Sequence, residues 1–340
     1  MAAFQMTITT HPNSDHADGP DSVGVMVDRL AGAGFDILLP HVKIGGEAFY
    51  HSHIAKVHPQ FAEWDPLTVI VQKAKAAGLQ VYAQVCVFPE GENSALIQSD
   101  ASLRAMTIDG EPTPWACPAS EKVRQYELSI FEEIMDNYDV NGVYMDYIRY
   151  NLDNVCFCPR CRSRFKEETG TDPVEIGRFS GFDESAQRGR NRKHPAWVQW
   201  IEWRVAQITT FVEALSAAAR KRECALSGAV FMDYPECIVN QGQDWAEWTE
   251  KGLLDSVVPM TYTNSLLMLK KRTKTHLAHV KGNCALWEGL GQNSSRSNLS
   301  TEALIEQIEA VRDEGAQGVM IFPYSTLTDE DLAALGKLNV

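Results

Sequence analysis

Short apolar runs alternate with longer segments of helical period along the chain, and this alternation is what most constrains the fold. Eight runs have the length and the β-branched content of buried strands. No Gly-x-Gly-x-x-Gly turn follows the first run, as a dinucleotide-binding sheet would require. The alternation therefore predicts a (β/α)8 TIM barrel. Its strands are expected at residues 4–9, 35–42, 79–88, 140–146, 225–234, 254–263, 284–291 and 318–324.

Two of the intervening segments have clear helix features. Asp65 is a suitable N-cap, Pro66 suits the first helical position and Gly78 a helix end, so residues 66–77 are expected to form the crossover between the second and third strands. Before the fifth strand, a wide apolar stripe predicts a helix packed on the sheet, with its tryptophans in the core. The stripe contains Trp197, Trp200, Ile201, Val205, Ile208, Val212 and Leu215.

The length of 340 residues and the 44% hydrophobic content suit one barrel domain covering residues 1–340. One long excursion follows the fourth strand, at residues 151–195. It begins with a cysteine cluster and ends in the Gly-rich, charged stretch GFDESAQRGRNRKHP. We expect that stretch to be a solvated loop, or a mobile flap, over one side of the site.

Charge narrows the range of partners. The chain has 31 basic and 45 acidic residues, a net charge of -14, which repels nucleic acid and anionic lipid. No apolar run reaches the roughly 20 residues of a membrane span, and no stretch has the form of a signal peptide. We expect neither a nucleic-acid nor a membrane partner, and no organic cofactor; a signal peptide removed on export would leave no trace.

Barrel enzymes place their chemistry where strands end and βα-loops begin. The predicted strand ends combine carboxylates, aromatic rings and fixed cations, as glycoside hydrolysis requires. Asp146, Glu288 and Asp233 are the candidate catalytic carboxylates, and two candidate ligands, Lys43 and Arg149, also suit a sugar carboxylate or sulfate. The substrate-binding candidates are His41, Lys43, Glu47, Arg149, Tyr262, Trp287 and Tyr324.

Several segments resemble the family-10-like glycosidases, a set of bacterial barrels. The resemblance rests on AGFDILLPHVKIGGEAFY, WDPLTVIVQKAKAAGLQVYAQVCVF, VRQYELSIFEEIMDNYDVNGVYMDYIRY and DSVVPMTYT, and it extends over nearly the whole chain. It implies that an Asp in the strand-four motif, here Asp146, is an active-site carboxylate. It also implies cleavage of a poly- or oligosaccharide, without naming the sugar.

The cysteines add a second resemblance. The run Cys156, Cys158 and Cys161 is similar to the zinc-binding run of family 42 β-galactosidases, which follows their strand-four acid. In that family a cysteine from the strand-three loop is the fourth ligand, a place matched by Cys117. The resemblance implies a structural Zn²⁺ held by four thiolates, with no open coordination position. Reduced thiols or a disulfide are the alternatives.

The family 42 comparison also shows a departure. Its strand-four acid is a Glu after Asn, whereas Asp146 follows Met145. Barrels of that clan place the nucleophile at the end of strand seven, which favours Glu288 as the partner of Asp146. Other barrels use a strand-five acid, which would make Asp233 the partner. We expect a retaining mechanism, with inversion left open, and Asp146 could instead serve only as a structural partner of Arg149.

Two other function classes fit parts of the sequence. A metal-dependent hydrolase would suit the histidines His41, His51, His53 and His58. Such barrels need a His-x-His pair at the end of the first strand, whereas the pair His51 and His53 follows the second strand. A barrel that binds glycan without cleaving it is the other alternative.

Overall fold

The computed structural model describes residues 3–151, 154–180 and 195–338. Within these residues eight parallel strands close into a barrel, because β1 pairs with both β12 and β2. The (β/α)8 prediction is confirmed. The barrel strands are β1 (Gln5–Thr10), β2 (Ile37–Ile44), β5 (Gln80–Cys86), β8 (Gly142–Asp146), β9 (Ala225–Val230), β10 (Ser256–Pro259), β11 (Ala285–Gly291) and β12 (Gly318–Phe322).

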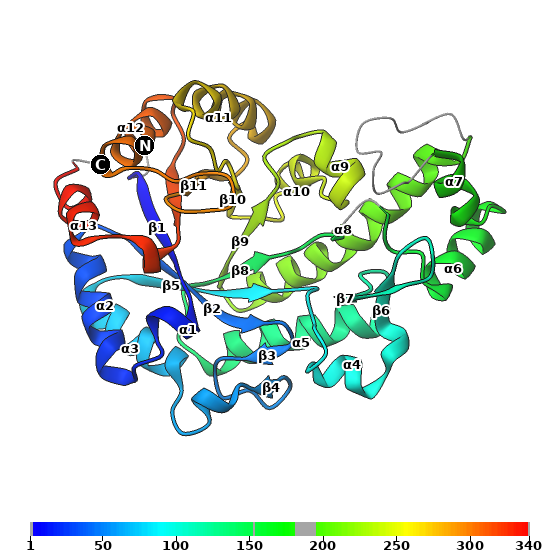
Figure 1. The fold of residues 1–340 in the computed structure, drawn as a ribbon, viewed down its shortest axis with the longest axis horizontal. Helices are drawn as coiled ribbons and strands as arrows, with labels where there is room; N and C mark the ends of the chain where they lie inside the picture. The colour runs from blue at the N-terminus through cyan, green and yellow to red at the C-terminus, as the bar shows by residue number, and fades with distance from the viewer. Residues whose placement is uncertain (1–2, 152–153, 181–194, 339–340) are drawn as a thin grey trace.

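A layer of helices surrounds the strands (Figure 1). The predicted caps of α3 are present, since the Asp65 carboxylate accepts hydrogen bonds from two backbone N–H groups and Gly78 has a left-handed φ of 79°. The tryptophan stripe of α8 is buried, as expected. The layer consists of α2 (Pro20–Gly32), α3 (Pro66–Ala77), α5 (Glu121–Asn137), α8 (Trp197–Lys221), α10 (Trp245–Glu250), α11 (Leu266–Val280), α12 (Thr301–Asp313) and α13 (Asp329–Leu335).

Large side chains fill the barrel interior toward the amino ends of the strands. Two glycines make room for them: a Cβ on Gly142 would lie 2.7 Å from the Tyr82 ring, and one on Gly318 would lie 2.7 Å from Trp287. Only the end formed by the carboxyl termini of the strands is left for chemistry. The inward-facing cluster is Ile37, Leu39, Tyr82, Tyr144, Ala229, Val258, Trp287 and Met320.

Two long loops extend side by side from that end (Figure 1). The loop after β5 contains α4 (Ala95–Ser99), η2 (Ala101–Leu103), β6 (Arg104–Met106) and β7 (Pro112–Ala116), and the loop after β8 contains α6 (Pro159–Thr169) and α7 (Pro173–Ser180). A bridge between Thr107 and Val155 joins them. The charged stretch expected to be a solvated loop or a flap lies outside the described residues, apart from its last residue.

The remaining elements are short. They are α1 (Pro12–Asp15), β3 (Glu47–Ala48), β4 (Lys56–Val57), η1 (Pro59–Phe61), α9 (Glu236–Gln241) and η3 (Tyr324–Thr326). The described part of the chain contains no helix with the length and apolarity of a membrane span.

Candidate active site at the mouth of the barrel

Asp146 is the last residue of β8, and residues from neighbouring strands hold its carboxylate. Oδ2 accepts a hydrogen bond from Gln84 Nε2 at 2.9 Å, and Oδ1 accepts one from the Tyr147 N–H at 2.8 Å. Gln84 Nε2 also lies 2.9 Å from His41 Nε2, while His41 Nδ1 lies 3.2 Å from the Thr10 carbonyl. This pattern assigns the His41 proton to Nδ1, so Gln84 donates to both of its neighbours.

Gln84 lies at the site but was not among the residues predicted from the sequence. Inward positions on β5 alternate through Tyr82, Gln84 and Cys86, so a polar side chain near the carboxyl end of this strand must face the mouth. That alternation was available in the sequence. His41, Cys86 and Asp146 come from three adjacent strands and offer ligand atoms within 4.8 Å of one another.

An arginine surrounded by aromatic rings lies beside Asp146. The Arg149 guanidinium carbon is 5.1 Å from the Trp115 ring centroid, 4.9 Å from that of Tyr147 and 4.9 Å from that of Phe231. Tyr147 has a φ of 52° and is 37% exposed. We call Trp115, Tyr147 and Phe231 the aromatic cage.

Tyrosines border Asp146 as well. Tyr262 stacks on Phe322, with centroids 5.7 Å apart and planes at 20°. Burial raises the pKa of the Tyr262 phenol, and the charge of Asp146 raises it further. The pKa of Tyr144 is raised for the same two reasons. Both phenols therefore stay protonated at neutral pH and can donate hydrogen bonds.

A cavity of about 220 Å³ opens next to His41, at the ends of β1, β2 and β12. Burial, followed by the neighbouring His41, lowers the pKa of His11 to about 4. Burial and the same group of histidines lower the pKa of His16 to about 3. These two rings are therefore uncharged at neutral pH, and His11 is one of the polar residues of the cavity. It is lined by Thr9, Thr10, His11, Ser14, His41, Phe322, Pro323 and Ser325.

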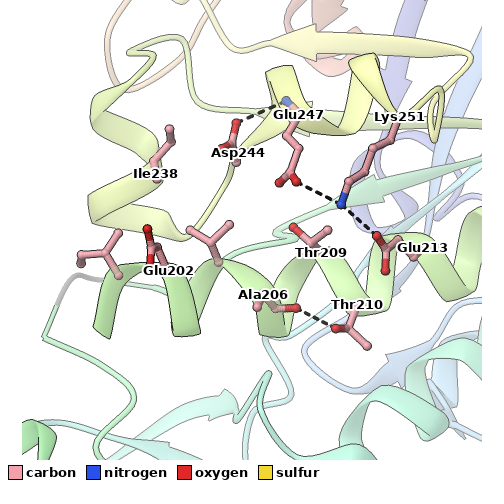
Figure 2. A pocket seen from close by; sticks show the side chains of 11 residues that line it. Glu202, Ala206, Thr209, Thr210, Glu213, Ile238, Asp244, Glu247 and Lys251 are labelled. Atoms are coloured by element: carbon pink, nitrogen blue, oxygen red, sulfur yellow. Dashed lines mark hydrogen bonds and ion pairs between the residues drawn. The ribbon is translucent and has the colours of Figure 1, made fainter. Parts of the chain in front are cut away.

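A larger groove of about 490 Å³ lies outside the barrel, between α8, α9 and α10 (Figure 2). Four of its eleven lining residues are acidic, and Lys251 pairs with Glu213 at 3.1 Å and with Glu247 at 3.0 Å. None of its lining residues belongs to a barrel strand. The groove is therefore a surface feature of the helix layer, and the candidate active site is at the mouth.

The prediction that Lys43 binds substrate is wrong. Its side chain is fully buried, and Nζ lies 2.9 Å from Glu127 Oε2, pairs with Glu90, and donates to the carbonyls of Cys86 and Val87 at 3.1 Å. These partners use the donors of the ammonium group. Lys43 instead ties β2 to α5 and to the loop after β5.

The prediction that Glu288 is a nucleophile at the mouth is also wrong. Glu288 alternates with Leu286 and Leu290, which face the outer core, so it points away from the barrel interior. The carboxylate is fully buried. Oε1 lies 2.6 Å from His276 Nδ1, and Oε2 accepts a hydrogen bond from Thr261 at 2.7 Å.

Trp287 faces inward but lies too deep to bind substrate, so this prediction is wrong as well. It is 5% exposed and pairs in register with Gly318, the first residue of β12. Its ring packs against Tyr82 at 5.9 Å. The strand runs on through residues 289–291, so Trp287 lies well before the carboxyl end of β11.

The His276–Glu288 pair makes stability depend on pH. Burial lowers the pKa of His276, but the Glu288 carboxylate outweighs burial, so the pKa is raised in the folded state. The stabilisation is complete below the unfolded pKa of about 6.5 and is lost as pH rises through the folded-state value. We therefore expect the free energy of unfolding of the wild type to fall above about pH 6.5 through this pair.

Urea denaturation between pH 6 and pH 9 checks this expectation. His276→Gln removes the titrating group, so the fall with pH should be smaller in this variant than in the wild type. Glu288→Ala should lose about 3–5 kcal/mol, as expected when one partner of a buried pair is removed. An unchanged pH slope in His276→Gln would contradict the assignment.

The other predicted binding residues have partners of their own. Glu47 pairs with Lys56 at 3.6 Å, and the Tyr324 hydroxyl accepts a hydrogen bond from Arg29 at 3.1 Å. Asp233 lies in the loop after β9, has a 37% exposed side chain and pairs with Arg272. Of the remaining carboxylate candidates, Asp233 is the one on a loop of the mouth.

The histidines considered for a metal-dependent hydrolase lie in separate contacts. His51 Nε2 is 3.1 Å from the Phe61 carbonyl, and His58 stacks on Phe49 at 4.9 Å. The His53 backbone N–H donates to Glu133. Among the described residues, the groups suited to a metal are the His41–Cys86–Asp146 set and a cluster of cysteines.

That cysteine cluster consists of Cys117, Cys156, Cys158 and Cys161, all fully buried and without a disulfide. Cys117 Sγ lies 3.4 Å from Cys161 Sγ and 3.7 Å from Cys158 Sγ, and the Cys158–Cys161 distance is 3.5 Å. Four sulfurs around Zn²⁺ at about 2.3 Å would be about 3.8 Å apart, close to this spacing. The cluster fits a tetrahedral metal ion and joins the two long loops of the mouth.

The fold is a (β/α)8 barrel with a hydrogen-bonded carboxylate at its mouth. The chain belongs to the glycosyl hydrolase-like 10 family, whose match covers residues 8–280. Its fold is similar to the PgaB (BpsB) glycoside hydrolase domain of Bordetella bronchiseptica, with a TM-score of 0.69, 16% identity, and coverage of 97% of this chain and 95% of that one. It is also similar to the β-amylase catalytic domain of Paenibacillus polymyxa, with a TM-score of 0.65, 12% identity, and coverage of 98% and 95%.

Another solved barrel and a sequence relative are also similar to this chain. The α-L-fucosidase of Paenibacillus thiaminolyticus has a TM-score of 0.62 and 12% identity, covering 99% of this chain and 48% of that one. An S-layer-related protein of Niallia circulans is 30% identical over 95 residues, which are 28% of this chain and 6% of that protein. The matched region is thus a small part of that relative.

Proposed function

We propose that the protein is a glycoside hydrolase that cleaves an oligo- or polysaccharide at the mouth of the barrel, with Asp146 as a catalytic carboxylate. The observation that carries the proposal is the setting of Asp146. It is the last residue of the barrel strand β8, two N–H groups orient its oxygens, and it lies beside an exposed tyrosine and two protonated phenols. The similarity of fold to a glycoside hydrolase domain, a β-amylase and an α-L-fucosidase supports a carbohydrate substrate.

Glycosidases commonly use a second carboxyl group, about 5–5.5 Å away when they retain and about 6.5–9.5 Å away when they invert. We propose Asp233 for this role, because Glu288 faces the helix layer. Phe231, two residues before Asp233, already touches Arg149 beside Asp146. The loop after β9 would then set the distance between the two carboxylates. We keep the retaining mechanism as part of the proposal.

The substrate contacts follow from what the mouth exposes. The Tyr147 ring suits stacking on an apolar sugar face, and the Tyr262 hydroxyl suits a sugar hydroxyl. The cavity beside His41 has room for one sugar unit next to Asp146, but not for several. Glu47 and Tyr324 remain proposed ligands of more distant sugar units.

We propose that the four cysteines hold one structural Zn²⁺. Buried thiolates need a compensating cation, and the sulfur spacing suits four zinc bonds. A bound zinc with four protein ligands has no open position, so its contribution would be structural. It would fix the loop after β8, which begins with Tyr147 and Arg149, to the loop that contains Trp115.

Incubation of the purified protein with a panel of polysaccharides, oligosaccharides and aryl glycosides tests the proposed function. We expect reducing ends or free aglycone to accumulate with at least one substrate, and the activity to survive EDTA because a closed zinc site is not catalytic. Selective binding without cleavage would identify a glycan-binding barrel instead. Activity that appears only with added metal would favour the metal-dependent hydrolase.

A further inference from the structure

Arg149 is held in place by rings from three segments of the chain. Trp115 belongs to β7, Tyr147 to the loop after β8 and Phe231 to the loop after β9, and all three centroids lie within 5.1 Å of its guanidinium carbon. A cation over an aromatic face is attracted by the negative charge density of that face. The aromatic cage therefore fixes the position of the charge without neutralising it.

The hydrogen-bond donors of Arg149 are only partly used. Nη1 donates to the Tyr150 carbonyl at 3.5 Å and to the Asn151 carbonyl at 3.3 Å. A guanidinium has three more N–H donors, on Nε and Nη2, and no described residue accepts from them. Neither nitrogen is among the buried unpaired polar atoms of the described chain, so both are open to solvent.

The described residues also offer Arg149 no carboxylate within ion-pair distance. Other arginines of the chain differ in this respect: Arg162 binds Asp172, and Arg222 binds Asp136. Burial lowers the pKa of Arg149, while the charge of nearby Asp146 raises it. Arg149 is thus a largely buried cation at the mouth whose free donors have no anion.

The backbone at the same place is strained. Tyr147 has a φ of 52°, a left-handed conformation that is unfavourable for a residue other than glycine. In this conformation its N–H donates to Asp146 Oδ1 and its ring, still 37% exposed, lies against Arg149. One turn therefore orients the proposed catalytic carboxylate and presents the cation beside it.

We infer that Arg149 binds the carboxylate of an acidic sugar, so that the substrate is a uronic-acid-containing glycan. The inference rests on the proposed function of the mouth and names its substrate class. The planar guanidinium can give two parallel N–H bonds to a planar carboxylate, whereas sulfate is tetrahedral. The overall charge of -14 does not oppose this, because distant charges are screened beyond about 8 Å at physiological salt.

The test compares acidic oligosaccharides with neutral counterparts of the same backbone. Oligogalacturonate, oligomannuronate and a glucuronic-acid-substituted xylooligosaccharide are each titrated calorimetrically at 4 °C beside their carboxyl-reduced forms. A sulfated oligosaccharide is added as the other anion. The proteins are the wild type, Arg149→Met, Arg149→Lys and, as a matched control on the helix layer, Arg222→Met. Circular dichroism confirms folding of each variant.

We expect at least one uronate to bind the wild type about tenfold or more tightly than its reduced form, as a charge-assisted bidentate contact predicts. Arg149→Met should abolish this preference, Arg149→Lys should keep part of it, and Arg222→Met should keep all of it. Three results would overturn the inference: no uronate preferred by the wild type, equal weakening of both members of a pair in Arg149→Met, or preference for the sulfated sugar. If Arg149→Met fails to fold, Arg149→Lys decides by the same comparison.

Chromatography of each mixture after titration separates this inference from the proposed function. Uronate-selective binding with no cleaved product would sink the hydrolase and leave the role of Arg149 intact. Cleavage confined to neutral glycans would do the reverse.

Discussion

Replacing Asp146 with Asn is expected to lower kcat on the best glycoside by about two to four orders of magnitude, as loss of a nucleophile or an acid–base group does. Asn has the same shape and can still accept the Tyr147 N–H bond at Oδ1, so the fold should persist. The amide cannot attack an anomeric carbon or exchange a proton. Initial rates over a range of substrate concentrations, with thermal melting of both proteins, measure the effect.

Two comparisons sharpen this result. Asp139→Asn removes an exposed partner of Lys75 and should leave turnover unchanged. Asp233→Asn should approach the loss in Asp146→Asn if Asp233 supplies the second carboxyl group, and should mainly raise KM if it only binds sugar. Near-normal turnover in Asp146→Asn would remove Asp146 from the chemistry.

The barrel could be predicted because its information is local. Each strand and helix is encoded by its own periodicity and caps, as Asp65 and Gly78 show for α3. For a related reason, the predicted ends of β9 and β10 lie several residues beyond the ends in the structure. Phe231 and Tyr262 are apolar enough to look like strand residues, but they lie beyond the strands and pack on Arg149 and Phe322.

The positions of Glu288 and Trp287 show that a local sequence pattern does not determine which side of a strand faces the barrel interior, or how deep a side chain lies. Neighbouring residues on a strand face opposite sides, so the bounds of a strand alone do not say which of its residues faces the barrel interior or how deep that residue lies. Glu288 is close to the mouth in sequence but faces α11, and Trp287 faces inward at the level of the first residue of β12. Both were treated as strand-end residues, although the predicted strand, like β11, continues to Gly291.

The buried position of Lys43 could not be predicted, because it depends on contacts with residues that are distant in the sequence. Its partners Glu90 and Glu127 lie 47 and 84 residues away in sequence, and only the closed barrel brings them together. The same holds for the aromatic cage, whose rings come from three loops. The position of Asp146 was predictable because a carboxylate at the carboxyl end of a barrel strand lies at the mouth. Gln84 could have been predicted in the same way, from its polar inward position near the end of β5.

Replacing Cys158 with Ser is expected to be the most destabilising of these substitutions. The proposed zinc site would lose one of four ligands and leave three buried thiols without a compensating ion. We expect a loss of about 5 kcal/mol or more, which is about 10 °C or more in Tm for a chain of this size. Cys284→Ser, at a half-buried thiol outside the cluster, is the matched control and should keep both stability and metal.

Activity should fall with the metal although no zinc ligand needs to touch substrate. Cys117 lies two residues after Trp115, and the cysteines that follow β8 anchor the loop that presents Tyr147 and Arg149. Loosening these loops should raise KM before it lowers kcat, because sugar contacts would be lost ahead of the Asp146 geometry set by Gln84. Elemental analysis should find about one zinc per wild-type chain and less in Cys158→Ser. The contrary result would be a wild type that is folded and active without metal, and whose four cluster thiols all react with a thiol reagent after unfolding. Packing alone would then hold the two loops together.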